Sequence, residues 1–109
     1  MQEARLKILK QLVAEEPNEP FNKYALAMEY MNIDQSEALT LLTNIKNEHS
    51  DYLPTYYQLG GILTENENYE EAEKIYLEGI SLATKQENDK ILKELKGAFQ
   101  RMKDEAEDW

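Results

Sequence analysis

The chain has 109 residues, 41% of them hydrophobic and 31% charged, which is enough for one small domain with an apolar core. Its net charge of −10, from 22 acidic and 12 basic residues, argues against nucleic acid and anionic membranes as partners, because both are bound by clustered Lys and Arg. There is no cysteine, so disulfides and thiolate metal sites are excluded. The N-terminal residues lack the continuous apolar run of a signal peptide, so we expect a cytoplasmic protein.

The N-terminal half of the chain is predicted to form three helices. The first spans residues 2–16, where leucines recur at helical spacing, and two prolines within four residues end it. Pro20 opens the second helix, because proline fits the first helical turn. Asp34 and Glu37 have the spacing of a capping box, so a third helix begins there. The second and third helices together cover residues 20–48.

The C-terminal half is predicted to form three more helices. Pro54 opens a pair that covers residues 54–83, and Asn68 with Glu71 repeats the capping spacing between its two helices. A last helix covers residues 88–105 and carries an apolar stripe on one side. No segment has the pattern of a strand. The short connections predict that neighbouring helices are antiparallel.

Residues of the same kind recur 34 positions apart along the chain. The repeated sets are Ala4, Ala38 and Ala72; Pro20 and Pro54; and Ile8, Leu42 and Tyr76. A period of 34 residues is typical of a helix–turn–helix solenoid, and such scaffolds usually bind other proteins.

The segment 54–83 resembles a tetratricopeptide repeat, whose pattern is Trp-x2-Leu-Gly-x2-Tyr, then Ala-x3-Phe, then Pro. The residues that carry the resemblance are Tyr56, Leu59, Gly60, Leu63, Ala72 and Tyr76. The segment 20–48 follows the same pattern with one residue fewer in its turn, through Lys23, Leu26, Ala27, Tyr30, Ala38 and Leu42.

The resemblance extends over nearly the whole chain. The first helix is similar to half a repeat, through Ala4 and Ile8, and the last helix resembles the helix that closes such arrays. It therefore implies an all-α fold, a short right-handed helix–turn–helix solenoid that forms a single domain over residues 1–109. The chain is similar to small stand-alone bacterial proteins of this family.

The resemblance also implies where a partner binds. In this family the first helix of each pair lines a concave groove, in which a peptide or a partner helix lies. The corresponding residues here are Phe21, Tyr24, Met28, Met31, Tyr57, Gly61, Thr64, Glu65, Lys90, Lys93 and Arg101. Tyr and Met suit adaptable recognition, because they offer a large contact area with a polar or flexible end. The alternative is that these residues are ordinary core and surface.

Two glycines on the fourth predicted helix point to different roles. Gly60 is explained by close packing of helix backbones, whereas Gly61 has no such explanation and marks a place on the concave face that is kept open.

We find no Gly-rich phosphate loop and no pairing of a nucleophile with a base, so we expect neither an enzyme nor a bound cofactor or metal. The first hypothesis is a protein-binding module or adaptor that holds a peptide or helix in its groove. The alternative is a structural protein that self-associates as a homodimer or larger homo-oligomer, through its end helices or its groove. Trp109 offers an exposed aromatic for such contacts.

Overall fold

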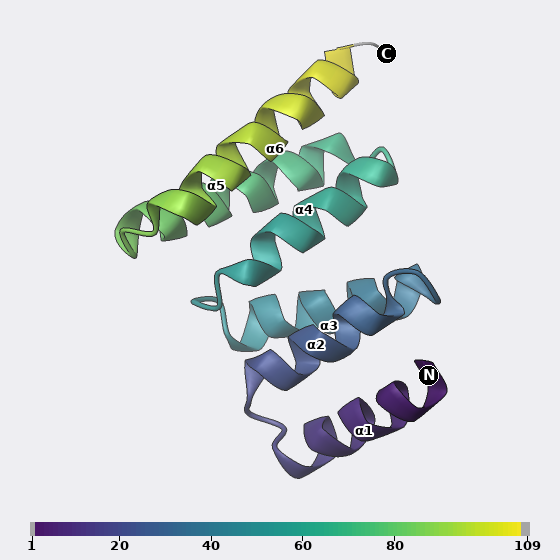
Figure 1. The fold of residues 1–109 in the computed structure, drawn as a ribbon. Helices are drawn as coiled ribbons and strands as arrows, with labels where there is room; N and C mark the ends of the chain where they lie inside the picture. The colour runs from purple at the N-terminus through teal and green to yellow at the C-terminus, as the bar shows by residue number, and fades with distance from the viewer. Residues whose placement is uncertain (1, 108–109) are drawn as a thin grey trace. The chain divides into compact units, whose positions relative to one another are not determined.

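The computed structural model describes residues 2–107, and over this range it contains helices and no strand (Figure 1). The helices are α1 (Gln2–Glu15), α2 (Pro20–Tyr30), α3 (Gln35–Glu48), α4 (Pro54–Glu65), α5 (Tyr69–Lys85) and α6 (Asp89–Glu107). All were expected, and α6 extends two residues beyond its predicted end. The predicted role of Trp109 lies outside the described residues.

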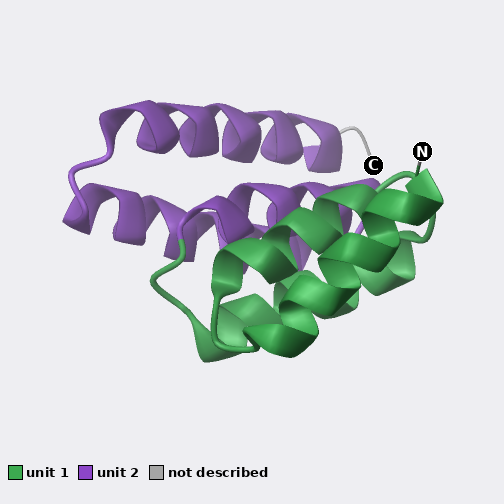
Figure 2. Cartoon of the chain, turned by 60° about the horizontal axis from the view of Figure 1, so that its bottom comes forward, with its two compact units in different colours: residues 1–52 green, residues 53–109 purple. Residues whose placement is uncertain are grey.

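The chain divides into two compact units, residues 1–52 and residues 53–109 (Figure 2). Unit 1 holds α1, α2 and α3, and α2 packs against both of the others. Unit 2 holds α4, α5 and α6, each of which packs against the other two. The single domain over residues 1–109 stays a prediction.

Of the four helix starts expected from the sequence, those at Pro20, Asp34 and Pro54 are found as expected. Glu19 accepts a hydrogen bond from the Phe21 N–H at 3.3 Å beside Pro20, and Asp34 accepts from the Glu37 N–H at 3.3 Å, which confirms that cap. The expected side-chain cap at Asn68 is wrong. Its backbone N–H donates to the Leu63 carbonyl in the turn that ends α4, and its side chain makes no capping hydrogen bond.

Unit 1 buries one apolar layer between α2 and α3. Ala27, Ala38, Leu42 and Ile45 are 0% exposed, and Leu26 is 5% exposed. Small alanines at the helix crossing let the backbones approach, and the larger side chains fill the space beside them. Burial of this layer is the main source of stability for unit 1.

In unit 2 two buried tyrosines each pack closely against a glycine. A Cβ on Gly60 would lie 2.5 Å from Cε1 of Tyr76, and a Cβ on Gly79 would lie 2.7 Å from Cβ of Tyr56. The Tyr76 ring and the Cβ of Tyr56 therefore occupy the places where side chains would otherwise be, which agrees with the packing role expected for Gly60. Around Gly61, in contrast, an added Cβ would meet nothing within 4 Å.

The adjacent glycines of α4 give a matched test of this packing. Gly60→Ala should destabilise unit 2 by about 1–3 kcal/mol, because the new methyl group overlaps the buried Tyr76 ring. Gly61→Ala should instead stabilise by up to about 1 kcal/mol, because alanine favours the helix and meets no neighbour. Urea unfolding followed by circular dichroism measures both changes. Equal effects of the two substitutions would contradict the packing described here.

The turns after α4 and α5 share one backbone geometry. Glu67 and Glu87 have φ values of 61° and 56°, in the left-handed region that favours glycine. In the first turn the Asn68 N–H donates to the Leu63 carbonyl and the Glu67 N–H to the Thr64 carbonyl, which is the Schellman pattern. Each turn thus ends one helix and starts the next within a few residues.

Glu67→Gly should therefore raise the free energy of unfolding by about 0.5–1 kcal/mol, since it removes the left-handed strain of a residue with a Cβ. As a control, Glu73→Gly within α5 should lower it by roughly 1 kcal/mol through lost helix propensity. Chemical denaturation of both variants checks the sign of each change in the free energy of unfolding. A loss of stability on Glu67→Gly would overturn the assigned turn geometry.

Candidate functional site

The exposed face of α2 in unit 1 is apolar and aromatic. Phe21, Tyr24, Met28 and Met31 follow one another at intervals of three and four residues, so they line one side of the helix. Phe21 is 58% exposed, and the other three are half-buried. The Tyr24 ring meets the Tyr52 ring edge-on, with 5.8 Å between centroids, so the aromatic part of this face is held in place.

The corresponding face of α4 in unit 2 has an open centre. Tyr57, Gly61 and Thr64 lie on one side of the helix, and Tyr57 is 37% exposed. The Thr64 hydroxyl donates to the Gly60 carbonyl at 2.8 Å, and its side chain is also hydrogen-bonded to the hydroxyl of Tyr76. The backbone at Gly61 is thus reachable between an aromatic ring and a fixed hydroxyl.

The two faces correspond in sequence register. Lys23 and Tyr56, Leu26 and Leu59, and Ala27 and Gly60 are buried pairs, and the members of each are 33 residues apart. The same offset matches Tyr24 with Tyr57, Met28 with Gly61 and Met31 with Thr64. Each unit therefore presents a tyrosine at the same position of its exposed face.

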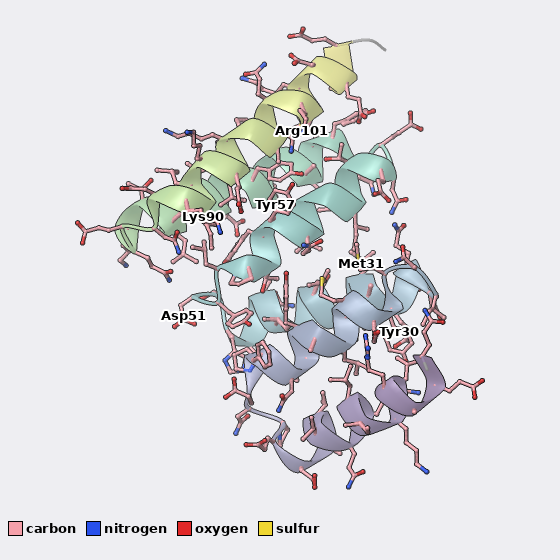
Figure 3. All side chains as sticks on the ribbon, viewed as in Figure 1. Tyr30, Met31, Asp51, Tyr57, Lys90 and Arg101 are labelled. Carbon is pink, nitrogen blue, oxygen red and sulfur yellow. The ribbon has the colours of Figure 1, made fainter. Side chains whose placement is uncertain are left out.

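The three predicted cations of α6 are all exposed. Lys90 and Arg101 are separated by about three turns and lie on the face of unit 2 turned toward the viewer in Figure 3, with Tyr57. Lys93 stands about two and a half turns before the buried Met102, so it lies on the opposite side of α6 from the core. Lys93 follows Lys90 by three residues, so these two side chains are neighbours on the helix surface, and the role of the three cations stays a prediction.

An acidic cleft of about 420 Å³ adjoins this face of unit 2 and was not foreseen from the sequence. Its lining residues are Thr64, Glu65, Glu67, Tyr69 and Glu105. Nearby, burial raises the pKa of Tyr76, and the charges of Arg101 and Glu105 act on that hydroxyl in opposite directions. Glu105 follows Glu65 by 40 residues in the chain, so no local sequence pattern could have joined them.

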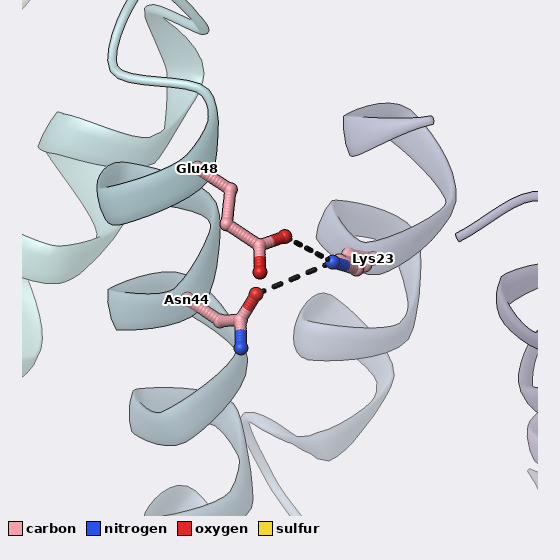
Figure 4. Close-up of polar contacts among 3 residues, drawn as sticks. All are labelled: Lys23, Asn44 and Glu48. Carbon is pink, nitrogen blue, oxygen red and sulfur yellow. Dashed lines mark hydrogen bonds and ion pairs between the residues drawn. The ribbon is translucent and has the colours of Figure 1, made fainter. Parts of the chain in front are cut away.

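A lysine stands in unit 1 where unit 2 has the aromatic Tyr56. The Lys23 ammonium group donates to Oδ1 of Asn44 at 3.2 Å and to Oε1 of Glu48 at 2.8 Å (Figure 4). The Lys23 side chain is 11% exposed, whereas that of Glu48 is 52% exposed. This polar cluster ties α2 to α3 and explains how the first repeat folds without the aromatic residue of its motif.

Comparisons with known proteins agree with this architecture. A scan against protein-family models gives no match, and a search of curated proteins finds no similar sequence. Two solved structures of a tetratricopeptide repeat domain protein from Salinibacter ruber are similar, each with 34% identity and a TM-score of 0.74. The NMR structure matches over 80% of this chain and 89% of that one, and the crystal structure over 78% and 97%.

The chain therefore belongs to the tetratricopeptide repeat family. The predicted fold class, an all-α helical solenoid, is confirmed, and folds of this class are in general protein–protein interaction modules. Among residues 2–107, no three His, Asp or Glu side chains are grouped as a metal ion would require. Within the same residues, no helix has the length and apolar character needed to cross a membrane.

The Lys23 cluster gives a pH-dependent contribution to stability. The hydrogen bond from Lys23, and then its charge, lower the pKa of Glu48 below its usual value of 4.5. A carboxylate whose pKa is lowered on folding adds stability above its unfolded pKa and loses it as the pH falls through the folded value. Glu48→Gln removes this contribution.

The native chain should therefore be more stable than the Glu48→Gln variant at about pH 7, and the difference should shrink as the pH falls below 4.5. Thermal unfolding of both proteins across this pH range measures the difference in stability. The other carboxylates are the same in both proteins, so their titration does not alter the difference. A difference that stays constant or grows toward low pH would contradict the ion pair.

Proposed function

We propose that the protein is a non-enzymatic interaction module, an adaptor that binds a peptide or helix of a partner protein on the exposed faces of α2, α4 and α6. No cofactor takes part. The observation that carries the proposal is the open backbone at Gly61, beside Tyr57 on α4. We also propose that it acts in the cytoplasm of a bacterium, in line with its lack of cysteine and its resemblance to small bacterial repeat proteins.

Gly61 supports this proposal because no packing contact among the described residues offsets the helix stability that glycine loses at this position. Glycine in a helix interior costs roughly 1 kcal/mol against alanine. For Gly60 the Tyr76 ring offsets that cost, but nothing within 4 Å of Gly61 would be displaced by a side chain. Glycine at such a position lets a ligand approach the helix backbone closely.

The surrounding side chains fit a peptide ligand. Tyr57 offers a ring with a polar end, and Arg101 supplies a guanidinium group that can hold a carboxylate or a backbone carbonyl. The acidic cleft at the C-terminal end of α4 can accept a cationic side chain of the same ligand. The α2 face of unit 1 by itself offers apolar contacts through Phe21 and Met28.

Substitutions on α4 should show whether this surface, and not another part of the chain, binds the partner. Gly61→Gln fills the open place without a clash, and Tyr57→Ala removes the ring, so each should weaken capture of the partner from source-cell lysate by about tenfold or more. Leu77→Ala is the matched control, because Leu77 is 48% exposed but lies on α5. Quantitative mass spectrometry of the captured proteins measures the change.

Circular dichroism must first show that the variants are as helical as the native chain. A partner retained by the control and lost from both α4 variants supports the proposal. A partner lost only on Leu77→Ala, or retained by all three variants, would place the interface on another surface. Capture of the protein itself alone would favour the alternative, self-association as a structural protein.

A further inference from the structure

Helix α1 exposes the face that its counterparts bury. In the 34-residue register Ala4 and Ile8 correspond to Ala38 and Leu42 of α3, and to Ala72 and Tyr76 of α5. The residues of α3 and α5 at these places are at most 3% exposed, whereas Ile8 is 59% exposed and Ala4 is also exposed. In α3 and α5 this face packs against the first helix of the same pair. Within unit 1, α1 packs against α2, and none of its described residues is buried.

The exposed side of α1 carries a short, symmetric seam, which we define as Arg5, Ile8, Leu12 and Glu15. The intervals along it are three, four and three residues, the spacing of a heptad seam on one side of a helix. Two apolar residues form the centre and two opposite charges form the ends. The Arg5 side chain is 69% exposed, Glu15 is exposed, and Leu12 is partly exposed.

This seam is complementary to itself when reversed. Intervals of three, four and three read the same in both directions, so two antiparallel copies of α1 come into register along the whole seam. Ile8 then meets Leu12 of the second copy, and Arg5 meets Glu15 of the second copy, each twice about a two-fold axis. Two parallel copies would instead place like charges opposite each other.

We infer that the seam of α1 is an isologous interface at which a second copy of this chain docks in antiparallel orientation. Arg5 already donates to Oε1 of Glu29 at 3.1 Å within its own chain. A guanidinium group has five N–H donors, so this bond leaves others for the second copy. The inference uses no residue of the α4 face, so it stands or falls independently of the proposed function.

The contact is a small one. One pair of 14-residue helices buries less than the roughly 1,600 Å² of a standard interface, so the dissociation constant should lie in the range of about 10 μM to 1 mM. Sedimentation equilibrium of the full chain over micromolar to millimolar concentrations should show a reversible monomer–dimer exchange. Ile8→Glu, which places a charge at the centre of the seam, should raise the dissociation constant at least tenfold.

Charge reversal gives the sharper test. Glu15→Arg alone would place arginine against Arg5 of the second copy. Arg5→Glu/Glu29→Gln would place glutamate against Glu15 of the second copy, and the Glu29→Gln change avoids a new repulsion within the chain. Each variant alone should be monomeric at concentrations where the native chain dimerises. An equal mixture of the two should form a heterodimer with a dissociation constant within about threefold of the native value.

Circular dichroism and thermal unfolding confirm that each variant is folded before mixing. Recovery of the dimer only in the mixture establishes the antiparallel pairing, because unfolding of either variant could not produce it. A native chain that is monomeric at every concentration would overturn the inference. So would a dimer that survives Ile8→Glu, or a mixture of the two folded charge variants that stays monomeric, because the contact would then lie elsewhere or run in another direction.

Discussion

The close approach of helix backbones over small residues is the constraint on which the rest of this structure depends. In unit 2 the ring of Tyr76 lies where a side chain of Gly60 would be, and the Cβ of Tyr56 lies where one of Gly79 would be. In unit 1 the small residues Ala27 and Ala38 allow a similar approach. These contacts fix the rotation of α4 and α2 about their own axes. Once that rotation is set, one side of each helix is turned away from the core and carries Tyr24 on α2 or Tyr57 on α4.

The helices and much of the packing could be predicted from the sequence, because prolines, the Asp34 cap and the 34-residue period act locally or repeat. Other features depend on residues distant in the chain. Nothing in the residues near Lys23 indicates its partners on α3, and the acidic cleft joins Glu65 to a residue of α6. That the eleven predicted groove residues together line one binding groove stays a prediction.

A family of interaction modules keeps its scaffold and varies the exposed side chains, so the family by itself does not name a partner. Here the informative positions are those at which the chain departs from what stability alone would favour. Gly61 lowers helix propensity without a packing contact, and Ile8 leaves an aliphatic side chain in water. These departures lie on different helices, which is why we assign them to different partners: a peptide or helix for α4, and a second copy for α1.

The central claim is that the exposed face of α4 contacts the partner, and site-specific photocrosslinking tests it most directly. The photoreactive amino acid p-benzoylphenylalanine would replace Tyr57, which already carries an aromatic ring, or Leu77 on α5 as the control. The account predicts that irradiation in the source cells yields a crosslinked partner from position 57 and not from position 77. Crosslinks from position 77 alone, or from neither position while the native chain still captures a partner, would contradict it.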